Sequence, residues 1–312
     1  MPKKCWWIPR CERPTWANNY FGICALNRYV LALLFVTLVW GATFPVLKLA
    51  TASLSGIEIS ALRFLIAAAC MLPWAWSASR RTWRDGGVLG LLVLVSYVAQ
   101  AYGLEFISSN RSAFLTSLNV LMVPLLGIAL GQRLSWVMLL AACLACLGIG
   151  LMSWDGGAHW LADSATIFGA LAYAAYVILL SKRAPNHSPR ELAATQIVWM
   201  AALGGVWMLI SAFGTDAVHT LPSRMSWSIG FGLAYLGVVA TSAMLFIQAM
   251  AQQHVAAEKA ALVYAMEPVF AALFAWLWLG EGLTLIAATG ATLVVVAVVA
   301  SEWKPAAGMR SG

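Results

Sequence analysis

The stretch that decides the fold is residues 28–49, RYVLALLFVTLVWGATFPVLKL, in which only Arg28 and Lys48 carry a charge. About 20 apolar residues in a row is the length of α-helix needed to cross the hydrocarbon core of a bilayer. A helix on the surface of a soluble protein would show a polar stripe along one side, and this stretch has none. Residues 28–49 therefore predict a membrane-spanning helix.

Stretches of this kind make up most of the chain. Of its 312 residues, 62% are hydrophobic and only 10% are charged, whereas soluble domains carry about 25% charged residues. We expect ten membrane-spanning helices, at residues 28–49, 57–77, 86–106, 111–131, 134–153, 163–182, 190–212, 226–250, 256–279 and 282–302. The predicted fold class is all-α integral membrane, and no length remains for a soluble catalytic domain.

The distribution of positive charge predicts the orientation. The net charge is +7, and with the N-terminus inside, most of the 19 Lys and Arg fall in the inside segments. The loop between the fifth and sixth spans holds Asp155 and Asp163 and no Lys or Arg. Because cytoplasmic loops are enriched in Lys and Arg, we expect both termini in the cytoplasm of a bacterium, with residues 1–27 as a lead-in and 303–312 as a tail. This explains the basic surplus without nucleic-acid binding.

The two halves of the chain match each other at polar positions. Two pairs match at an offset of 148 residues: Gln100 with Gln248, and Arg111 with Lys259. Each half holds five predicted spans, an odd number, so the second half must enter the membrane in the opposite sense. Inverted repeats of this kind recur in secondary transporters. We therefore predict two inverted five-helix repeats, at 28–153 and 163–302.

Several short motifs resemble a known family. The stretch WGATFP at 40–45, followed by Lys48 and by LRF at 62–64, resembles the opening of an EamA domain of the drug/metabolite transporter superfamily. The stretches EKAAL at 258–262, EPVF at 267–270 and LGEGLT at 279–284 resemble the close of a second copy, and ALAYAAY at 170–176 fits its beginning. The resemblance implies ten helices in two inverted repeats, and transport of amino acids or related metabolites, often export.

Polar groups inside the predicted spans are the candidates for substrate binding, because each costs a few kcal/mol at bilayer depth unless it is paired or hydrated. Glu267 directly precedes Pro268, which opens the backbone carbonyl of Tyr264. A carboxylate beside such a kink suits an ammonium group or a transported proton. The alternative is that Glu267 is held by a neighbouring helix and only sets packing.

Amides and aromatic rings complete the predicted cavity. Gln100 and Gln248 can donate and accept hydrogen bonds, as zwitterionic substrates require; their alternative role is an interhelical hydrogen bond of about 0.6 kcal/mol. Aromatic faces suit cationic groups, although many of the 16 Trp must belong to the membrane interface. The predicted cavity residues are Trp40, Thr43, Phe44, Tyr97, Gln100, Asn119, Tyr173, Gln248, Tyr264 and Glu267. Arg63 is predicted to be shallow, pairing with Glu58 or a lipid phosphate.

No catalytic motif, metal site or cofactor site is predicted. The CxxC of Cys143 and Cys146 lies in apolar sequence without a nearby His, which favours packing. The four His fall in different loops, which argues against an integral-membrane enzyme, the least favoured hypothesis. The leading hypothesis is a secondary transporter in the bacterial inner membrane that exports amino acids or related small molecules by alternating access, with possible proton coupling. A lipid or drug translocator of the same fold is the alternative, and the sequence predicts no oligomeric state.

The predicted orientation places loop 183–190 in the cytoplasm, and one added cysteine tests it. In a variant whose native cysteines are replaced by alanine, Ser188→Cys is expected to resist an impermeant maleimide applied from the periplasmic side. It should react once the membrane has been opened. Labelling from the periplasmic side of intact membranes would refute the topology.

Overall fold

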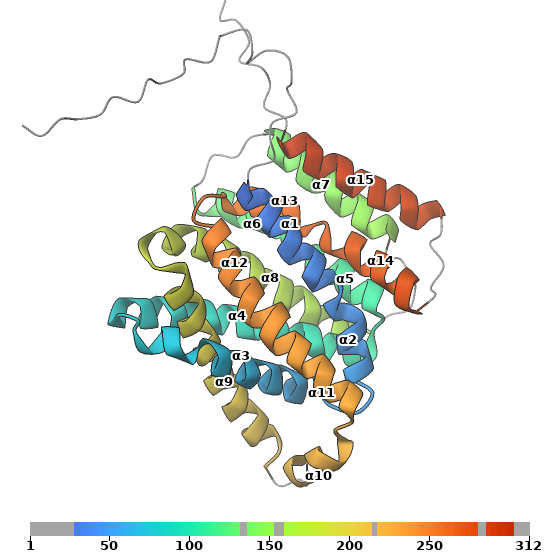
Figure 1. Ribbon diagram of the computed structural model, residues 1–312. Coiled ribbons are helices and arrows are strands. Elements are labelled where there is room, and N and C mark those ends of the chain that lie inside the picture. Colours follow the sequence, from blue (N-terminus) through green and yellow to red (C-terminus); the bar gives the residue numbers. More distant parts are fainter. Residues whose placement is uncertain (1–27, 132–135, 153–158, 214–216, 280–284, 303–312) are drawn as a thin grey trace, which may run out of the picture.

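The fold was analysed in a computed structural model that describes residues 28–131, 136–152, 159–213, 217–279 and 285–302. Within these ranges every regular element is a helix (Figure 1). In chain order the elements are α1 (Arg28–Gly41), α2 (Thr43–Ala50), α3 (Gly56–Trp76), α4 (Arg80–Phe106), α5 (Ser109–Ser117), α6 (Asn119–Ala129), α7 (Trp136–Met152), α8 (Trp160–Arg183), η2 (Ala184–Asn186), α9 (Pro189–Ser211), α10 (Ala217–Arg224), α11 (Trp227–Ala234), η3 (Tyr235–Ala243), α12 (Met244–Ala251), α13 (Ala257–Tyr264), α14 (Glu267–Leu279) and α15 (Leu285–Glu302).

Each predicted span is occupied by one helix or by a run of consecutive helices. Eight of these segments are long and apolar enough to cross a membrane, as judged by length and composition. The other two predicted spans hold α7 and α15, whose apolar stretches, 136–151 and 288–300, are shorter. The largest boundary difference is in the third span, which starts at Arg80 because the Ser79 hydroxyl accepts a hydrogen bond from the Thr82 backbone and caps the helix.

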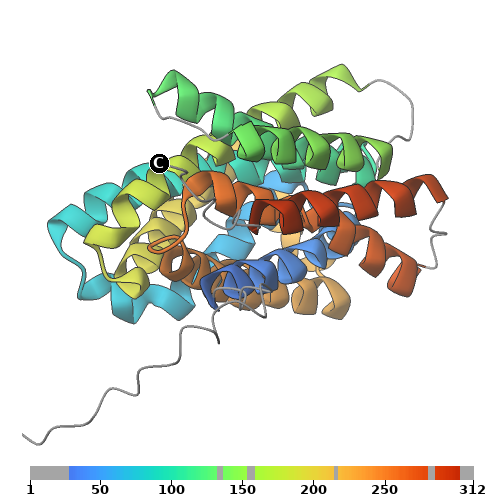
Figure 2. The same ribbon diagram turned by 90° about the horizontal axis from the view of Figure 1, so that it is seen from above.

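The helices pack in a bundle in which segments distant in sequence are neighbours. The α7 and α15 helices lie side by side at one edge, as Figure 1 and Figure 2 both show. Nearer the centre, α4 packs against both α8 and α9, and α3 packs against α9. The contact of α4 with α9 depends on small residues, because Gly86 and Gly90 face the backbone of Gln196. Close approach at small residues is a usual means of packing helices in membranes.

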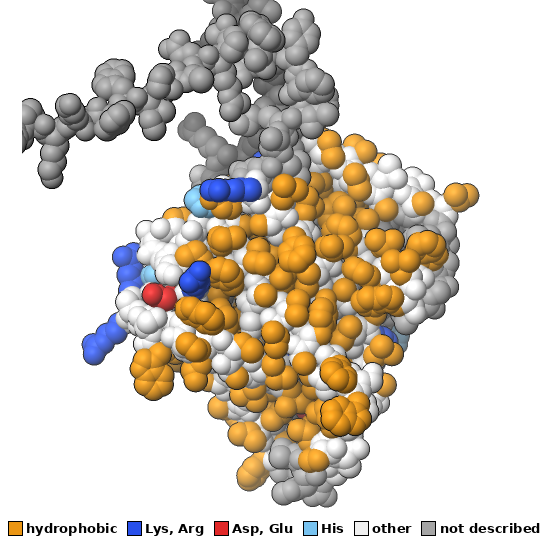
Figure 3. Space-filling model, viewed as in Figure 1, with side chains coloured by type: hydrophobic (Ala, Val, Ile, Leu, Met, Phe, Trp, Pro, Cys, Tyr) orange, Lys and Arg blue, Asp and Glu red, His pale blue; other side chains and the backbone are white. Residues whose placement is uncertain are grey.

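The outer surface of the bundle is apolar. Large hydrophobic side chains such as Leu140, Leu161, Phe168 and Leu209 are more than half exposed. In Figure 3 hydrophobic side chains cover most of the face in view, while the visible Lys and Arg lie mainly toward the left edge, where α3 ends and α4 begins. A continuous apolar surface of this extent is not stable in water. With the apolar helices, it indicates a multi-pass membrane protein.

Three of the membrane-length segments are interrupted. Proline accounts for two interruptions, because it removes a backbone hydrogen bond and clashes with the carbonyl four residues earlier. Pro45 follows the break between α1 and α2, and Pro268 follows the break between α13 and α14. The third break, at Leu118 between α5 and α6, has no such proline. There the Asn119 amide donates to the Thr116 carbonyl at 3.0 Å, and such side-chain bonds compete with the helical pattern.

A π-helical segment, η3, lies between α11 and α12. The hydroxyls of Thr241 and Ser242 donate to carbonyls five residues earlier, those of Leu236 and Gly237. π-helical turns are rare and are often found at functional sites. The wider turn also leaves the Ala240 carbonyl able to accept a hydrogen bond from the Trp40 indole at 2.9 Å. The segment η3 is thereby joined to α1.

The glycine contact between α4 and α9 gives a stability prediction. A Cβ at Gly86 would overlap the Thr195 side chain and come within 3.0 Å of the Gln196 backbone nitrogen. We expect Gly86→Ala to destabilise the protein by about 1–3 kcal/mol, the usual cost of overpacking, and to lower its thermal unfolding temperature in detergent. Gly205→Ala is the control, because nothing lies within 4 Å of a Cβ there. Equal unfolding temperatures for the two variants would contradict this packing.

Candidate binding site

A narrow polar cavity lies inside the bundle. Seven helices contribute to its wall: α1, α2, α3, α4, α5, α8 and α14. The lining residues are Trp40, Thr43, Arg63, Ser96, Tyr97, Gln100, Thr116, Tyr173 and Glu267. A cavity with this polarity at bilayer depth costs free energy unless its groups are paired or meet a ligand or water.

The helix interruptions border this cavity. Trp40 and Thr43 lie on either side of the break between α1 and α2, and Glu267 is the first residue of α14, directly after a break. Thr116 comes two residues before the break at Leu118. Interrupted membrane helices commonly form substrate sites, because their ends present unpaired backbone groups and helix dipoles. The Thr43 hydroxyl donates a hydrogen bond to one such backbone group, the Trp40 carbonyl, at 2.7 Å.

Arg63 is the only basic residue among the described residues that line this cavity, and its side chain has contacts on two sides. Its Nε and Nη2 donate to the Thr241 hydroxyl at 3.1 and 2.9 Å. Its guanidinium lies over the Tyr97 ring, 4.8 Å from the centroid, and 5.6 Å from that of Phe64. These distances suit cation–π attraction. The residue is 4% exposed.

The prediction for Arg63 was therefore wrong. Arg63 neither snorkels to the rim nor pairs with Glu58, which instead binds Arg224 at the end of α10. The distance of Arg63 from the start of its span suggested a shallow position. Arg224 of α10 bonds the Ser53 carbonyl and Glu58 at the start of this span, and Arg63, seven residues after the first residue of α3, already lies inside the bundle.

Glu267 places a carboxylate in the same cavity. The residue is 8% exposed, and among the described residues none donates a hydrogen bond to it or forms an ion pair with it. Among the described residues, the wall thus holds one basic and one acidic side chain, Arg63 and Glu267, which do not pair with each other.

Six of the ten predicted cavity residues line this cavity: Trp40, Thr43, Tyr97, Gln100, Tyr173 and Glu267. Phe44 does not, because it is fully buried in an apolar cluster with Leu47 and Leu104. Asn119 instead bonds the backbone at the α5–α6 break.

Gln248 and Tyr264 do not line the cavity but contact residues that do. The Gln248 amide nitrogen donates to the hydroxyls of Tyr173 and Tyr264, both at 3.0 Å, and its carbonyl oxygen accepts from Tyr176 at 3.2 Å. Tyr264 in turn packs against Trp40, with the ring centroids 5.7 Å apart. Gln248 therefore fixes the orientation of Tyr173, which does face the cavity.

Ser96 and Thr116 are the cavity residues that the sequence did not single out, together with Arg63. Their hydroxyls are common in membrane helices, where they bond the backbone of their own helix. Thr116 does so, donating to the Ser112 carbonyl at 2.8 Å. Helical spacing could have indicated Ser96 as a cavity residue, because it lies one turn before Gln100 and therefore on the same face of the helix.

Fold and cavity together define a multi-pass membrane protein with an internal polar cavity. The model of the EamA-like transporter family matches residues 27–154 and again residues 160–301. The chain belongs to the EamA-like transporter family, and its general role is that of a transporter.

Curated relatives agree with this assignment. An uncharacterized transporter of Archaeoglobus fulgidus is 27% identical over 280 residues, covering 86% of this chain and 84% of the relative. A probable amino-acid metabolite efflux pump of Escherichia coli K12 is 26% identical over 294 residues, covering 89% and 96%. A solved crystal structure superposes with a TM-score of 0.71 at 15% identity, covering 88% of this chain and 98% of the other. That last likeness concerns the fold.

The three hydrogen bonds of Gln248 give a second stability prediction. Gln248→Met keeps the side-chain length but leaves three buried tyrosine hydroxyls without this partner, at a cost of about 1–3 kcal/mol for unpaired groups. Gln100→Met is the matched control, because Gln100 faces the cavity and makes one long bond, 3.4 Å, to Thr116. We expect the lower unfolding temperature for Gln248→Met. The opposite order would show that the tyrosines do not depend on Gln248.

Proposed function

We propose that this protein is a secondary transporter that carries an amino acid or a closely related zwitterion by alternating access. The binding site is the polar cavity, where Arg63 meets the substrate carboxylate and Glu267 meets its ammonium group. The efflux-pump relatives support this substrate class and the direction of export.

The observation that carries the proposal is the presence of a basic and an acidic side chain in one narrow cavity. Arg63 and Glu267 both line the cavity and are not paired with each other. A zwitterion supplies a partner for each of these side chains at once, whereas a purely apolar lipid tail or drug would leave both buried polar groups without a partner, at a cost in free energy. The rings of Trp40 and Tyr173, with centroids 6.1 Å apart, add faces that suit the ammonium group.

We also propose ten membrane-spanning helices in two inverted repeats, 28–153 and 163–302, with both termini in the cytoplasm of the bacterial inner membrane. The two matches to one family model support a duplicated unit. The breaks at Leu118 and at 265–266 support it as well, because they fall at equivalent places when the halves are aligned at an offset of 148 residues. Repeats of this kind exchange inward-open and outward-open arrangements around a central site.

Ion pairs join the two proposed repeats near both proposed ends of the bundle. At the proposed outer end, Arg111 pairs with Asp163 at 2.7 Å, and Arg224 pairs with Glu58. At the proposed inner end, Asp85 pairs with Arg183 at 2.6 Å. Each pair joins helices from different repeats. Alternating access therefore means breaking one set of pairs while the other holds.

The charge pair is tested by transport in proteoliposomes. We expect saturable counterflow of a labelled amino acid, found by screening a panel. We also expect a loss of apparent affinity of about 10- to 100-fold in Glu267→Gln and in Arg63→Gln, the cost of one hydrogen bond to a charged group. Both variants should still insert in the membrane. Wild-type flux in both Glu267→Gln and Arg63→Gln would contradict the proposed binding site.

Substrate analogues separate a binding role from a structural one. An amino-acid amide, which lacks the carboxylate, should compete poorly in the wild-type protein. In Arg63→Gln it should compete about as well as the amino acid, while Arg63→Lys keeps the wild-type preference. Unchanged selectivity in a folded Arg63→Gln protein would contradict the assignment. If transport follows a pH gradient, this dependence should be lost in Glu267→Gln, because Glu267 is the only carboxylate that lines the described cavity.

A further inference from the structure

A second, more open hollow lies where α4 begins and α8 ends. Four arginines from these two helices line it, together with Asp85 and Asn186: Arg80, Arg81, Arg84 and Arg183. We call this hollow the arginine pocket. It lies at the end of the bundle that we propose to be cytoplasmic, away from the substrate cavity.

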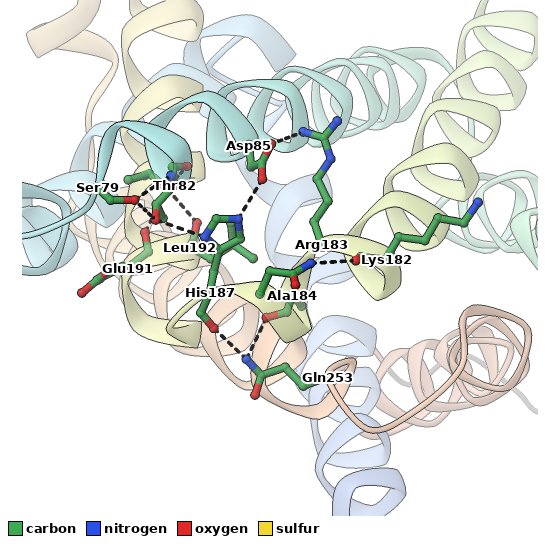
Figure 4. Close-up of polar contacts among 12 residues, drawn as sticks. Ser79, Thr82, Asp85, Lys182, Arg183, Ala184, His187, Glu191, Leu192 and Gln253 are labelled. Atoms are coloured by element: carbon green, nitrogen blue, oxygen red, sulfur yellow. Dashed lines mark hydrogen bonds and ion pairs between the residues drawn. The ribbon is translucent and has the colours of Figure 1, made fainter.

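Asp85 is the single acidic side chain among the described residues that line the arginine pocket, and it already has two partners. As Figure 4 shows, Asp85 lies between Arg183 and His187. One carboxylate oxygen is 2.6 Å from Arg183 Nη1, and the other is 2.7 Å from His187 Nε2. His187 is fixed in turn by a 3.1 Å bond between its Nδ1 and the Thr82 hydroxyl. Asp85 therefore cannot balance the three arginines at the start of α4.

Those three arginines, Arg80, Arg81 and Arg84, are exposed and make no ion pair within the described part of the chain. They also stand at the N-terminus of α4, where the helix dipole disfavours positive charge. Their contribution to membrane orientation explains a positive charge on this side. It does not explain why they share one hollow with Arg183, because Lys182 and Arg190 add charge at the same end without lining it.

The surroundings indicate which anion fits. Trp76, at the end of α3, is 83% exposed, and Trp74 is 41% exposed. Exposed tryptophans at helix ends mark the headgroup level of a membrane. The planar guanidinium of arginine matches phosphate oxygens in a bidentate geometry. Basic pockets between membrane helices on the cytoplasmic side are known to bind anionic headgroups.

We propose that the arginine pocket binds the headgroup phosphate of an anionic phospholipid. The bound headgroup bridges Arg80, Arg81 and Arg84 on α4 to Arg183 on α8. These two helices carry Tyr97 and Tyr173 of the substrate cavity. The lipid therefore reinforces the same α4–α8 contact that Asp85 and Arg183 make. Binding is independent of the proposed substrate, so its test does not need transport.

Native mass spectrometry of the purified full chain, titrated with phosphatidylglycerol or phosphatidylcholine, tests this pocket. The pocket variant is Arg80→Gln with Arg84→Gln. The matched control is Lys182→Gln with Arg190→Gln, which removes the same charge from exposed positions outside the pocket. We expect phosphatidylglycerol to bind the pocket variant about 10- to 30-fold more weakly than the wild type, because each arginine near the surface contributes on the order of a tenfold effect or less. The control should bind like the wild type.

A thermal measurement and a competitor complete the test. Phosphatidylglycerol should raise the unfolding temperature of the wild type and the control, but not of the pocket variant, because a ligand stabilises only the state that binds it. Millimolar inorganic phosphate should not displace the lipid. Equal losses in both variants would show a diffuse charge effect and overturn the proposal. Displacement by inorganic phosphate would assign the pocket to a free anion and overturn the lipid assignment.

Discussion

The burial of Arg63 is the constraint on which the rest of the site depends. A guanidinium at this depth needs partners from the protein, because the bilayer supplies none. It finds them in the Thr241 hydroxyl of η3 and in the ring faces of Tyr97 and Phe64. None of these partners is an anion, so the positive charge stays available to the cavity. The π-helical turn thus contacts two residues of the cavity wall, Arg63 through the Thr241 hydroxyl and Trp40 through the Ala240 carbonyl.

The helices themselves were largely predictable from the sequence. Apart from η2 and α10, each lies in a predicted apolar stretch, because a bilayer requires backbone hydrogen bonds to be satisfied within the segment. Two interruptions also have a local signal, because Pro45 and Pro268 stand in the first turns of α2 and α14, although Pro73 and Pro124 lie inside α3 and α6 without breaking them. The break at Leu118 and the π-helical η3 were not predictable in this way. The first depends on side-chain bonding by Asn119, and the second has no proline and no single residue that marks it.

The site was predictable where it depended on repeats and kinks, and not where it depended on contacts between distant segments. Glu267 was found because it stands beside Pro268. Arg63 was assigned to the rim because its position was judged along α3 alone. Arg63 contacts Thr241, and Glu58 pairs with Arg224 instead of Arg63. Both contacts join residues more than 160 positions apart. Gln248 matches Gln100 in the repeat, yet the two amides differ in their partners. Gln248 is hydrogen-bonded to three tyrosines and has a structural role, whereas Gln100 bonds no tyrosine and faces the cavity.

The most direct test of the account is an experimental structure of the protein with a transported amino acid bound. The account predicts the substrate carboxylate within hydrogen-bonding distance of the Arg63 guanidinium, and its ammonium group against Glu267 and the face of Trp40 or Tyr173. Arg63 should keep its bonds to Thr241. A substrate bound elsewhere in the bundle, or one in this cavity with its carboxylate turned away from Arg63, would contradict the central claim.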